Sequence, residues 1–131
     1  MKYSNGKAIP ISINQAFESI KFLSDRTPKT NGNSDGFCTL VEYRDGGIFL
    51  AHYAGNSEWE RHTNGDEMVM VMGGETVLIL LQNGDEISNP MSQGMLLVVP
   101  KNTWHRFESP KGVKIMTITP QPTDHSVERP E

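Results

Sequence analysis

This sequence lacks the features of several protein classes. Its single cysteine, Cys38, rules out an internal disulfide and fits a reducing compartment, so we expect a cytoplasmic protein. No apolar run approaches the roughly 18 residues that a membrane helix needs. The first residues also lack the apolar core of a signal peptide. With a net charge of −4 and no Lys/Arg cluster, we expect neither a nucleic-acid nor a membrane partner.

One segment near the start has helical periodicity. Its apolar residues fall at positions 13, 16, 17, 20 and 23, and Ser12 is a suitable N-cap. Residues 29–36 are polar and rich in turn-forming types, which predicts a loop. We therefore expect residues 1–36 to form a short helix and a loop that pack on the rest of the chain.

Short β-branched or apolar runs dominate the remaining sequence, and glycine-containing turns separate the early ones at a spacing of about ten residues. This rhythm predicts an all-β sandwich or barrel over residues 37–119. We expect strands at 37–43, 48–53, 68–72, 76–81, 95–99 and 113–119. The proline-containing segment 120–131 predicts an irregular C-terminal tail that lies over the surface or over a partner subunit.

Side chains of types that commonly ligate metals occur in two segments of the chain. Glu60 and His62 are two residues apart, so on a strand both point to one face. Asn64-Gly65 favours a hairpin, after which Glu67 opens the return strand and faces His62. His105 begins a later strand. Imidazoles and carboxylates together suit zinc, iron, manganese, nickel or copper rather than calcium or magnesium.

Three assignments have alternatives. His105 is either a metal ligand or a hydrogen-bonded core histidine beside Trp104. Asp66 is the alternative to Glu67, because a shift of the strand register by one residue would turn Asp66 toward the site in place of Glu67. Glu60 either ligates a metal or pairs with Arg61 or Arg106 at the rim of the site.

Two apolar residues are candidates for the wall of a substrate pocket. Val69 shares the strand face of Glu67, and Phe107 shares the face of His105. His52 lies in no motif, and we expect it to be structural or exposed. We expect His125, in the tail, to be solvated.

The spacing of these residues resembles the two motifs of the cupin superfamily, in particular its small single-domain members. Glu60-x-His62, four residues, Glu67, six residues and Gly74 follow the first motif, with Glu60 in place of its first histidine. The second motif is represented by a longer run. It comprises Gly94, five residues, Pro100-x-Asn102, two residues, His105, three residues and Ser109. Asn102 replaces a glycine there, and asparagine tolerates the left-handed turn that glycine supplies.

The resemblance implies a double-stranded β-helix, a short jelly-roll barrel that holds one divalent transition metal. Carried over position by position, the ligands would be Glu60, His62, Glu67 and His105. This donor set favours iron, manganese or zinc over nickel and copper. Cupins commonly pair through exposed sheet edges, so we also expect a homodimer.

The fold alone does not select a function. The first hypothesis is a metal-dependent enzyme acting on a small organic molecule, either a dioxygenase-type oxidoreductase or a metal-assisted isomerase or lyase. The alternative is a non-catalytic module that binds or senses a small molecule.

Overall fold

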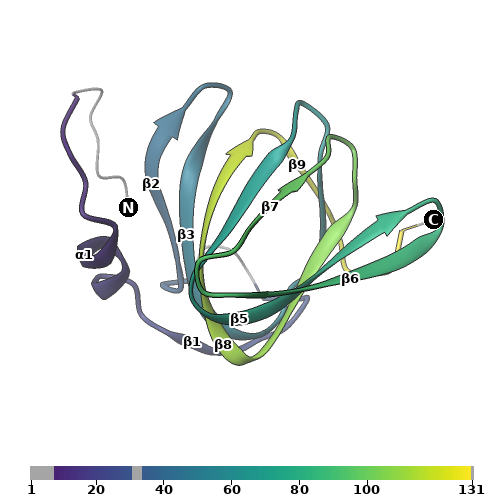
Figure 1. The fold of residues 1–131 in the computed structure, drawn as a ribbon, viewed down its shortest axis with the longest axis horizontal. Helices are drawn as coiled ribbons and strands as arrows, with labels where there is room; N and C mark the ends of the chain where they lie inside the picture. Colours follow the sequence, from purple (N-terminus) through teal and green to yellow (C-terminus); the bar gives the residue numbers. More distant parts are fainter. Residues whose placement is uncertain (1–7, 31–33, 131) are drawn as a thin grey trace.

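The computed structural model describes residues 8–30 and 34–130. It contains one six-residue helix, α1 (Ile13–Glu18), which begins after the N-cap Ser12, whose side chain accepts a hydrogen bond from the Gln15 amide. The described strands form one twisted sheet that curves around an interior (Figure 1). They are β1 (Leu23–Arg26), β2 (Phe37–Tyr43), β3 (Gly46–Asn56), β4 (Trp59–His62), β5 (Glu67–Gln82), β6 (Asp85–Ser92), β7 (Leu96–Val99), β8 (His105–Pro120) and β9 (Thr123–Ser126).

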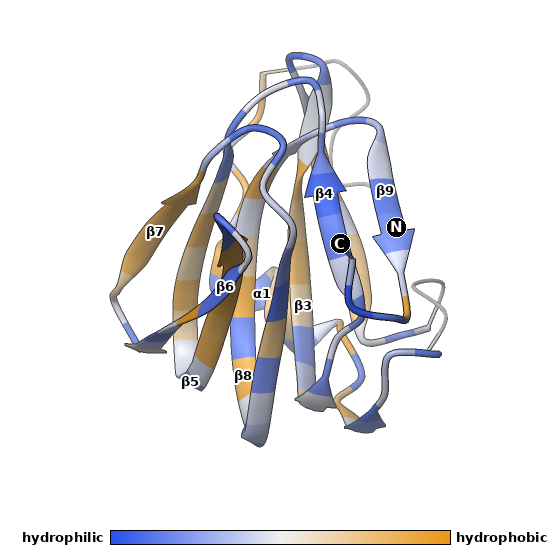
Figure 2. Ribbon diagram, turned by 90° about the vertical axis from the view of Figure 1, so that its right-hand side faces the viewer, coloured by the Kyte–Doolittle hydropathy of each residue, from blue (hydrophilic) through white to orange (hydrophobic). Residues whose placement is uncertain are grey.

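The antiparallel pair β5–β8 organises the sheet. Each of these strands is 16 residues long, and their pairing runs from Met68↔Ile118 to Leu80↔His105. On either side of this pair, β8 also pairs with β3 and β4, while β5 pairs with β6 and β7. Figure 2 shows β5 and β7 as mostly hydrophobic and β4 and β9 as mostly hydrophilic.

The β5–β8 pair bends near its middle, where its register shifts between Val71 and Val77. Gly74 lies at this bend with a φ of 72°. A Cβ atom at this position would lie 2.3 Å from the carbonyl oxygen of Gly112. The two backbones therefore approach so closely that position 74 admits only a residue without a side chain.

Burial along β5 follows the expected alternation. Glu67, Val69 and Val71 are buried and face the interior, whereas the methionines between them are half-buried on the other face. The interior face contributes to a large apolar cluster that includes Leu78, Val99 and Phe107 as well as the two valines. A second cluster joins α1 to β2 and β3 through Ala16, Phe17, Ile20, Cys38, Leu40 and Leu50.

The all-β barrel with a short N-terminal helix is confirmed. The helix, however, ends at Glu18, and Leu23–Arg26 forms a strand that the periodic pattern did not predict. This strand, β1, runs parallel to the end of β3, so its backbone finds hydrogen-bond partners on an existing strand. No helix in the described part of the chain has the length and apolarity to cross a bilayer.

Two further elements differ from the sequence expectations. Thr123–Ser126 of the tail forms β9, which pairs with β4, because the prolines flank these four residues and leave their backbone free to pair. The turn at Asn64-Gly65 does not close a hairpin, since β4 pairs with β8 and β9 and not with β5. It carries the chain across the barrel instead. Asn102 has the predicted left-handed conformation, with a φ of 63°.

The bend yields a stability prediction. Gly74→Ala should lower the free energy of unfolding by at least about 2 kcal/mol more than Gly84→Ala does, because the backbone at the bend must shift. Gly84 is a matched control: its φ is 82°, yet a Cβ there would meet nothing within 4 Å. Chemical denaturation of both variants measures the difference. Equal losses would show that only the left-handed backbone matters and that the close approach does not.

Candidate metal centre

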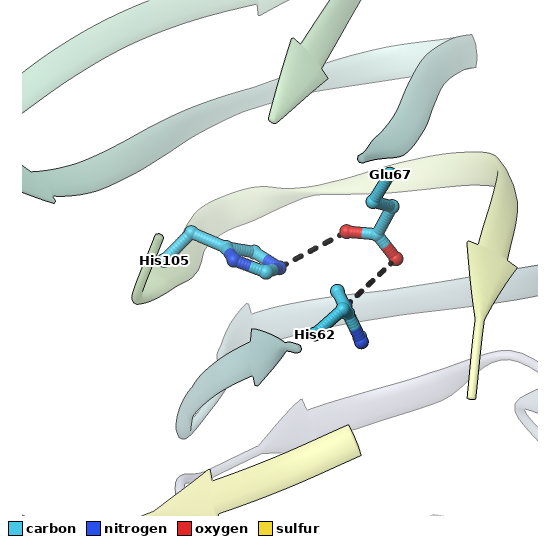
Figure 3. A group of neighbouring side chains, drawn as sticks. All are labelled: His62, Glu67 and His105. Carbon is cyan, nitrogen blue, oxygen red and sulfur yellow. Dashed lines mark ion pairs between the residues drawn. The ribbon is translucent and has the colours of Figure 1, made fainter. Parts of the chain in front are cut away.

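Three side chains converge inside the barrel from three strand ends (Figure 3). His62 is the last residue of β4, Glu67 is the first of β5 and His105 is the first of β8. Their exposed fractions are 3%, 5% and 1%. His62 Nε2 lies 3.2 Å from Glu67 Oε2, and His105 Nε2 lies 3.0 Å from Glu67 Oε1. All three residues can place one donor atom within 4.8 Å of the others.

The other nitrogen of each imidazole is anchored. His105 Nδ1 lies 3.0 Å from the carbonyl oxygen of Thr103, and since a carbonyl only accepts, Nδ1 is the donor. His62 Nδ1 lies 3.0 Å from Thr123 Oγ1, which donates its own proton to Gln121 Oε1. In the neutral ring each histidine therefore presents the lone pair of Nε2 to the centre, as a metal ligand does.

A threonine holds the carboxylate. Thr119 Oγ1 donates a 2.6 Å hydrogen bond to Glu67 Oε2, and Thr117 Oγ1 lies 2.8 Å behind it. Both threonines lie on β8, on either side of the outward-facing Ile118. Sequence reasoning did not assign Thr119 or Thr123, although two threonines at alternate positions near the end of β8 were a signal for the first.

Three donor atoms of the cluster have no hydrogen-bond partner in the described part of the chain: His62 Nε2, Glu67 Oε1 and His105 Nε2. The two short N···O contacts do not meet hydrogen-bond geometry, and one ligand atom from each residue lies within 4.8 Å of the others, close enough to share one ion. A buried polar atom without a partner is destabilising by about 1–3 kcal/mol. A divalent cation bound there would satisfy all three atoms, so the arrangement fits a metal ion.

Electrostatics within the cluster favour a charged pair when no cation is bound. Burial alone would raise the pKa of Glu67, but the two adjacent histidines outweigh it and lower the pKa to about 2. Burial likewise opposes charge on His105, yet Glu67 raises the pKa of that histidine above its ordinary value. Binding of a cation would replace the imidazolium proton, so metal uptake should release protons.

Glu67, not Asp66, faces the centre. Asp66 is exposed, and its Oδ1 accepts a 2.8 Å hydrogen bond from the Lys101 amide. The register alternative is thereby settled.

Glu60 lies near the three-residue cluster but is not part of it. It pairs with His105 in the sheet, its side chain is 25% exposed, and its carboxylate lies 3.8 Å from His125 Nδ1. Burial and the charge of Glu67 raise its pKa. The alternative partners are engaged elsewhere, because Arg61 binds Asp124 at 2.8 Å and Arg106 binds Glu108 at 2.8 Å.

A cavity of about 680 Å³ opens beside the centre. Its lining includes His62, Glu67 and Glu60 together with the apolar face of Phe107. Val69, the other predicted wall residue, is fully buried in the apolar cluster and is not among the lining residues.

His125 of the tail is exposed, as expected, with 54% of its side chain accessible. It nevertheless lines the same cavity, and its Nδ1 contacts the carboxylate of Glu58. The placement of His125 depends on the pairing of β9 with β4, which no local pattern reveals.

Comparisons with known protein families and structures agree with the fold described above. A family model described as a cupin domain matches residues 48–119. The fold is similar to a cupin-2 domain-containing protein from Shewanella frigidimarina, with a TM-score of 0.61 and 23% identity over 85% of this chain and 94% of that one. A protein from Neisseria meningitidis matches with a TM-score of 0.61 and 23% identity, over 86% of this chain and all of that one.

A structure of hydroquinone 1,2-dioxygenase PnpCD, in complex with Cd²⁺ and 4-hydroxybenzonitrile, is a more distant match. Its TM-score is 0.57 and its identity 17%, over 64% of this chain and 63% of that one. None of the curated protein sequences matches the chain at a significant level.

The geometry predicts which histidines retain a metal. His62→Ala and His105→Ala should each lose most of the bound ion while the barrel stays folded, because apolar strand packing carries the fold. His52→Ala is the matched control, since His52 packs on Phe22 outside the centre, with ring centroids 4.8 Å apart. Elemental analysis with circular dichroism measures both effects. Full occupancy in either centre variant would remove that residue from the ligand set.

Proposed function

The chain belongs to the cupin superfamily, and from that premise we propose that it is a metal-dependent enzyme that acts on a small organic molecule in the barrel cavity. One observation carries the proposal. Among the described residues, His62 Nε2, Glu67 Oε1 and His105 Nε2 are buried without hydrogen-bond partners and lie close together, and His62 and Glu67 also line a cavity of about 680 Å³. A purely structural cluster would have saturated these atoms.

The donor set suits an ion with positions left for a substrate. Two imidazoles and one carboxylate form the ligand type of non-haem iron sites, which keep open positions for substrate, water or dioxygen. We propose one divalent transition metal per chain, with iron, manganese or zinc favoured over nickel or copper. When bound, such an ion supplies Lewis acidity or oxygen activation.

The residues around the centre then have separate tasks. His62, Glu67 and His105 hold the ion, while Thr119 and Thr123 fix the orientation of Glu67 and His62. Phe107 contributes an apolar wall that excludes water from one side of the bound molecule. His125, held by Glu58, is the imidazole of the cavity outside the centre, and it suits proton exchange between substrate and solvent.

Among reactions, a dioxygenase-type oxidation of a chelating carbonyl or diol compound is our first choice, and a metal-assisted isomerase or lyase reaction is the second. The open positions on a two-histidine, one-carboxylate centre support the oxygenase. The likeness to hydroquinone 1,2-dioxygenase supports it only through the shared fold.

We propose that Glu60 is a fourth ligand of the ion. With Glu60 and Glu67 both bound, the ligands would carry two negative charges in total, which neutralise a divalent cation. Glu60→His should therefore shift selectivity toward nickel and copper, which gain more from an added imidazole. Glu60→Gln should lower metal content. Metal competition followed by elemental analysis measures both.

Glu75→Gln is the control for Glu60, because Glu75 lies outside both groups of described side chains that could hold a metal ion, His62-Glu67-His105 and Glu58-Glu60-His125. If Glu60→Gln retains the metal content and metal choice of the parent, Glu60 is not a ligand.

The proposed function is tested on protein purified without a metal-binding tag. We expect about one transition metal per chain, and a melting temperature that falls on chelation, since ligation stabilises only the folded state. Oxygen uptake on a panel of diketones, catechols and thiols should reveal turnover that His105→Ala abolishes. Tight binding of a panel member without turnover would instead indicate a binding module. A metal-free protein whose melting temperature ignores chelators would refute the enzyme.

A further inference from the structure

Arg26 lies on the cavity wall in an unusual setting. It is the last residue of β1, outside the segment that the cupin family model matches. Its guanidinium carbon lies 4.4 Å from the ring centroid of Tyr53 and 4.8 Å from that of Phe37. Both rings line the same cavity. Two aromatic contacts therefore hold a planar cation in a fixed place at the cavity wall.

The approach of β1 to β3 depends on a glycine. Gly55 pairs with Arg26 in the parallel ladder and has a φ of 115°. A Cβ at position 55 would lie 2.1 Å from the Arg26 carbonyl oxygen. The backbone beneath Arg26 is thus positioned by direct contact.

The guanidinium has no acidic partner. Among the described residues, no carboxylate lies within ion-pair distance of Arg26, although its positive charge partly offsets the rise in the pKa of Glu60 that burial and Glu67 cause. Arg61 and Arg106, which lie outside the cavity lining, differ in this respect, because each binds a carboxylate. A half-buried cation without a counter-ion favours an anion arriving from solution.

The hydroxyl of Tyr53, like the guanidinium of Arg26, lacks a well-placed partner in the described part of the chain. The side chain is 1% exposed, lines the cavity, and its hydroxyl makes no hydrogen bond of good geometry within the described chain. Burial raises the pKa of Tyr53, so the phenol keeps its proton and remains a donor. The Tyr53 hydroxyl lies beside Ser109 and Arg26 without good hydrogen-bond geometry to either, so a fixed cation and a buried donor lie in contact on one wall.

We propose that Arg26 and Tyr53 form a subsite that binds the carboxylate of the substrate. The inference rests on the proposed function and narrows its substrate class to small organic monocarboxylic acids. The planar fork of a guanidinium matches the two oxygens of a carboxylate. Phe37 and Phe107 offer apolar contacts for the carbon skeleton.

The charge of the cavity argues for a monoanion rather than a phosphate. Among the described residues that line the cavity, Arg26 is the one lysine or arginine, whereas Glu58, Glu60 and Glu67 all line the same space. A single guanidinium balances one negative charge, and a dianion would meet further repulsion from these carboxylates. The subsite thus selects for the carboxylate group and against higher charge.

The test compares acids with their uncharged amides. Benzoate, salicylate and pyruvate are titrated beside benzamide, salicylamide and pyruvamide by calorimetry, on both metal-loaded and chelator-treated protein. The parent should bind at least one acid more tightly than its amide. Arg26→Gln should reduce affinity for that acid by about tenfold or more and leave the amide unchanged, because a charge-assisted hydrogen bond is lost.

Controls isolate the subsite. Arg44→Gln removes an arginine that also packs on a tyrosine, with its guanidinium carbon 5.4 Å from the Tyr43 ring, but outside the cavity. It should bind like the parent. Tyr53→Phe removes one hydroxyl and should weaken acid binding severalfold. It retains the ring, so it tests the subsite even if Arg26→Gln unfolds.

The subsite is refuted if no acid binds more tightly than its amide, or if Arg26→Gln and Tyr53→Phe leave that preference intact. This outcome differs from failure of the proposed function, which shows as absent metal and absent turnover. The acid preference should persist in chelator-treated protein, because Arg26 and Tyr53 bind the carboxylate without the ion.

Discussion

The bend in the β5–β8 pair is the constraint on which the site depends. Glu67 opens β5, while His105 pairs with Leu80, 13 residues further along that strand. In a flat ladder these two positions would be roughly 40 Å apart, at about 3.3 Å per residue. The bend at Gly74 folds the ladder so that its two ends face each other, and His105 Nε2 lies 3.0 Å from Glu67 Oε1. The grouping of these candidate metal ligands is thus a product of barrel closure.

This dependence explains what the sequence could and could not predict. The resemblance to the cupin motifs implied four ligands, of which the structure brings three together, His62, Glu67 and His105, while Glu60 lies outside that group. The predicted hairpin at Asn64-Gly65 was wrong, because the turn there crosses the barrel. Turn chemistry specifies that a chain reverses, but long-range pairing decides which strand it meets.

The supporting residues were missed for the same reason. Thr123 and His125 reach the centre and the cavity only because β9 pairs with β4, and Arg26 reaches the cavity wall only because β1 pairs with β3. Both short strands lie in segments whose composition indicates loop, tail or helix. Pairing with an existing strand edge supplies backbone hydrogen bonds that local propensity does not anticipate.

The candidate metal ligands and the other polar residues of the cavity therefore come from different parts of the chain. His62, Glu67 and His105 all lie within the segment that the cupin family model matches, whereas Arg26, Thr123 and His125 lie outside it. Closure of the β5–β8 pair brings Glu67 and His105 together, and both belong to that matched segment. Strands β1 and β9, which lie outside the matched segment, do not take part in that closure. Differences in substrate should accordingly arise from them, since they line the cavity without deciding whether the barrel closes.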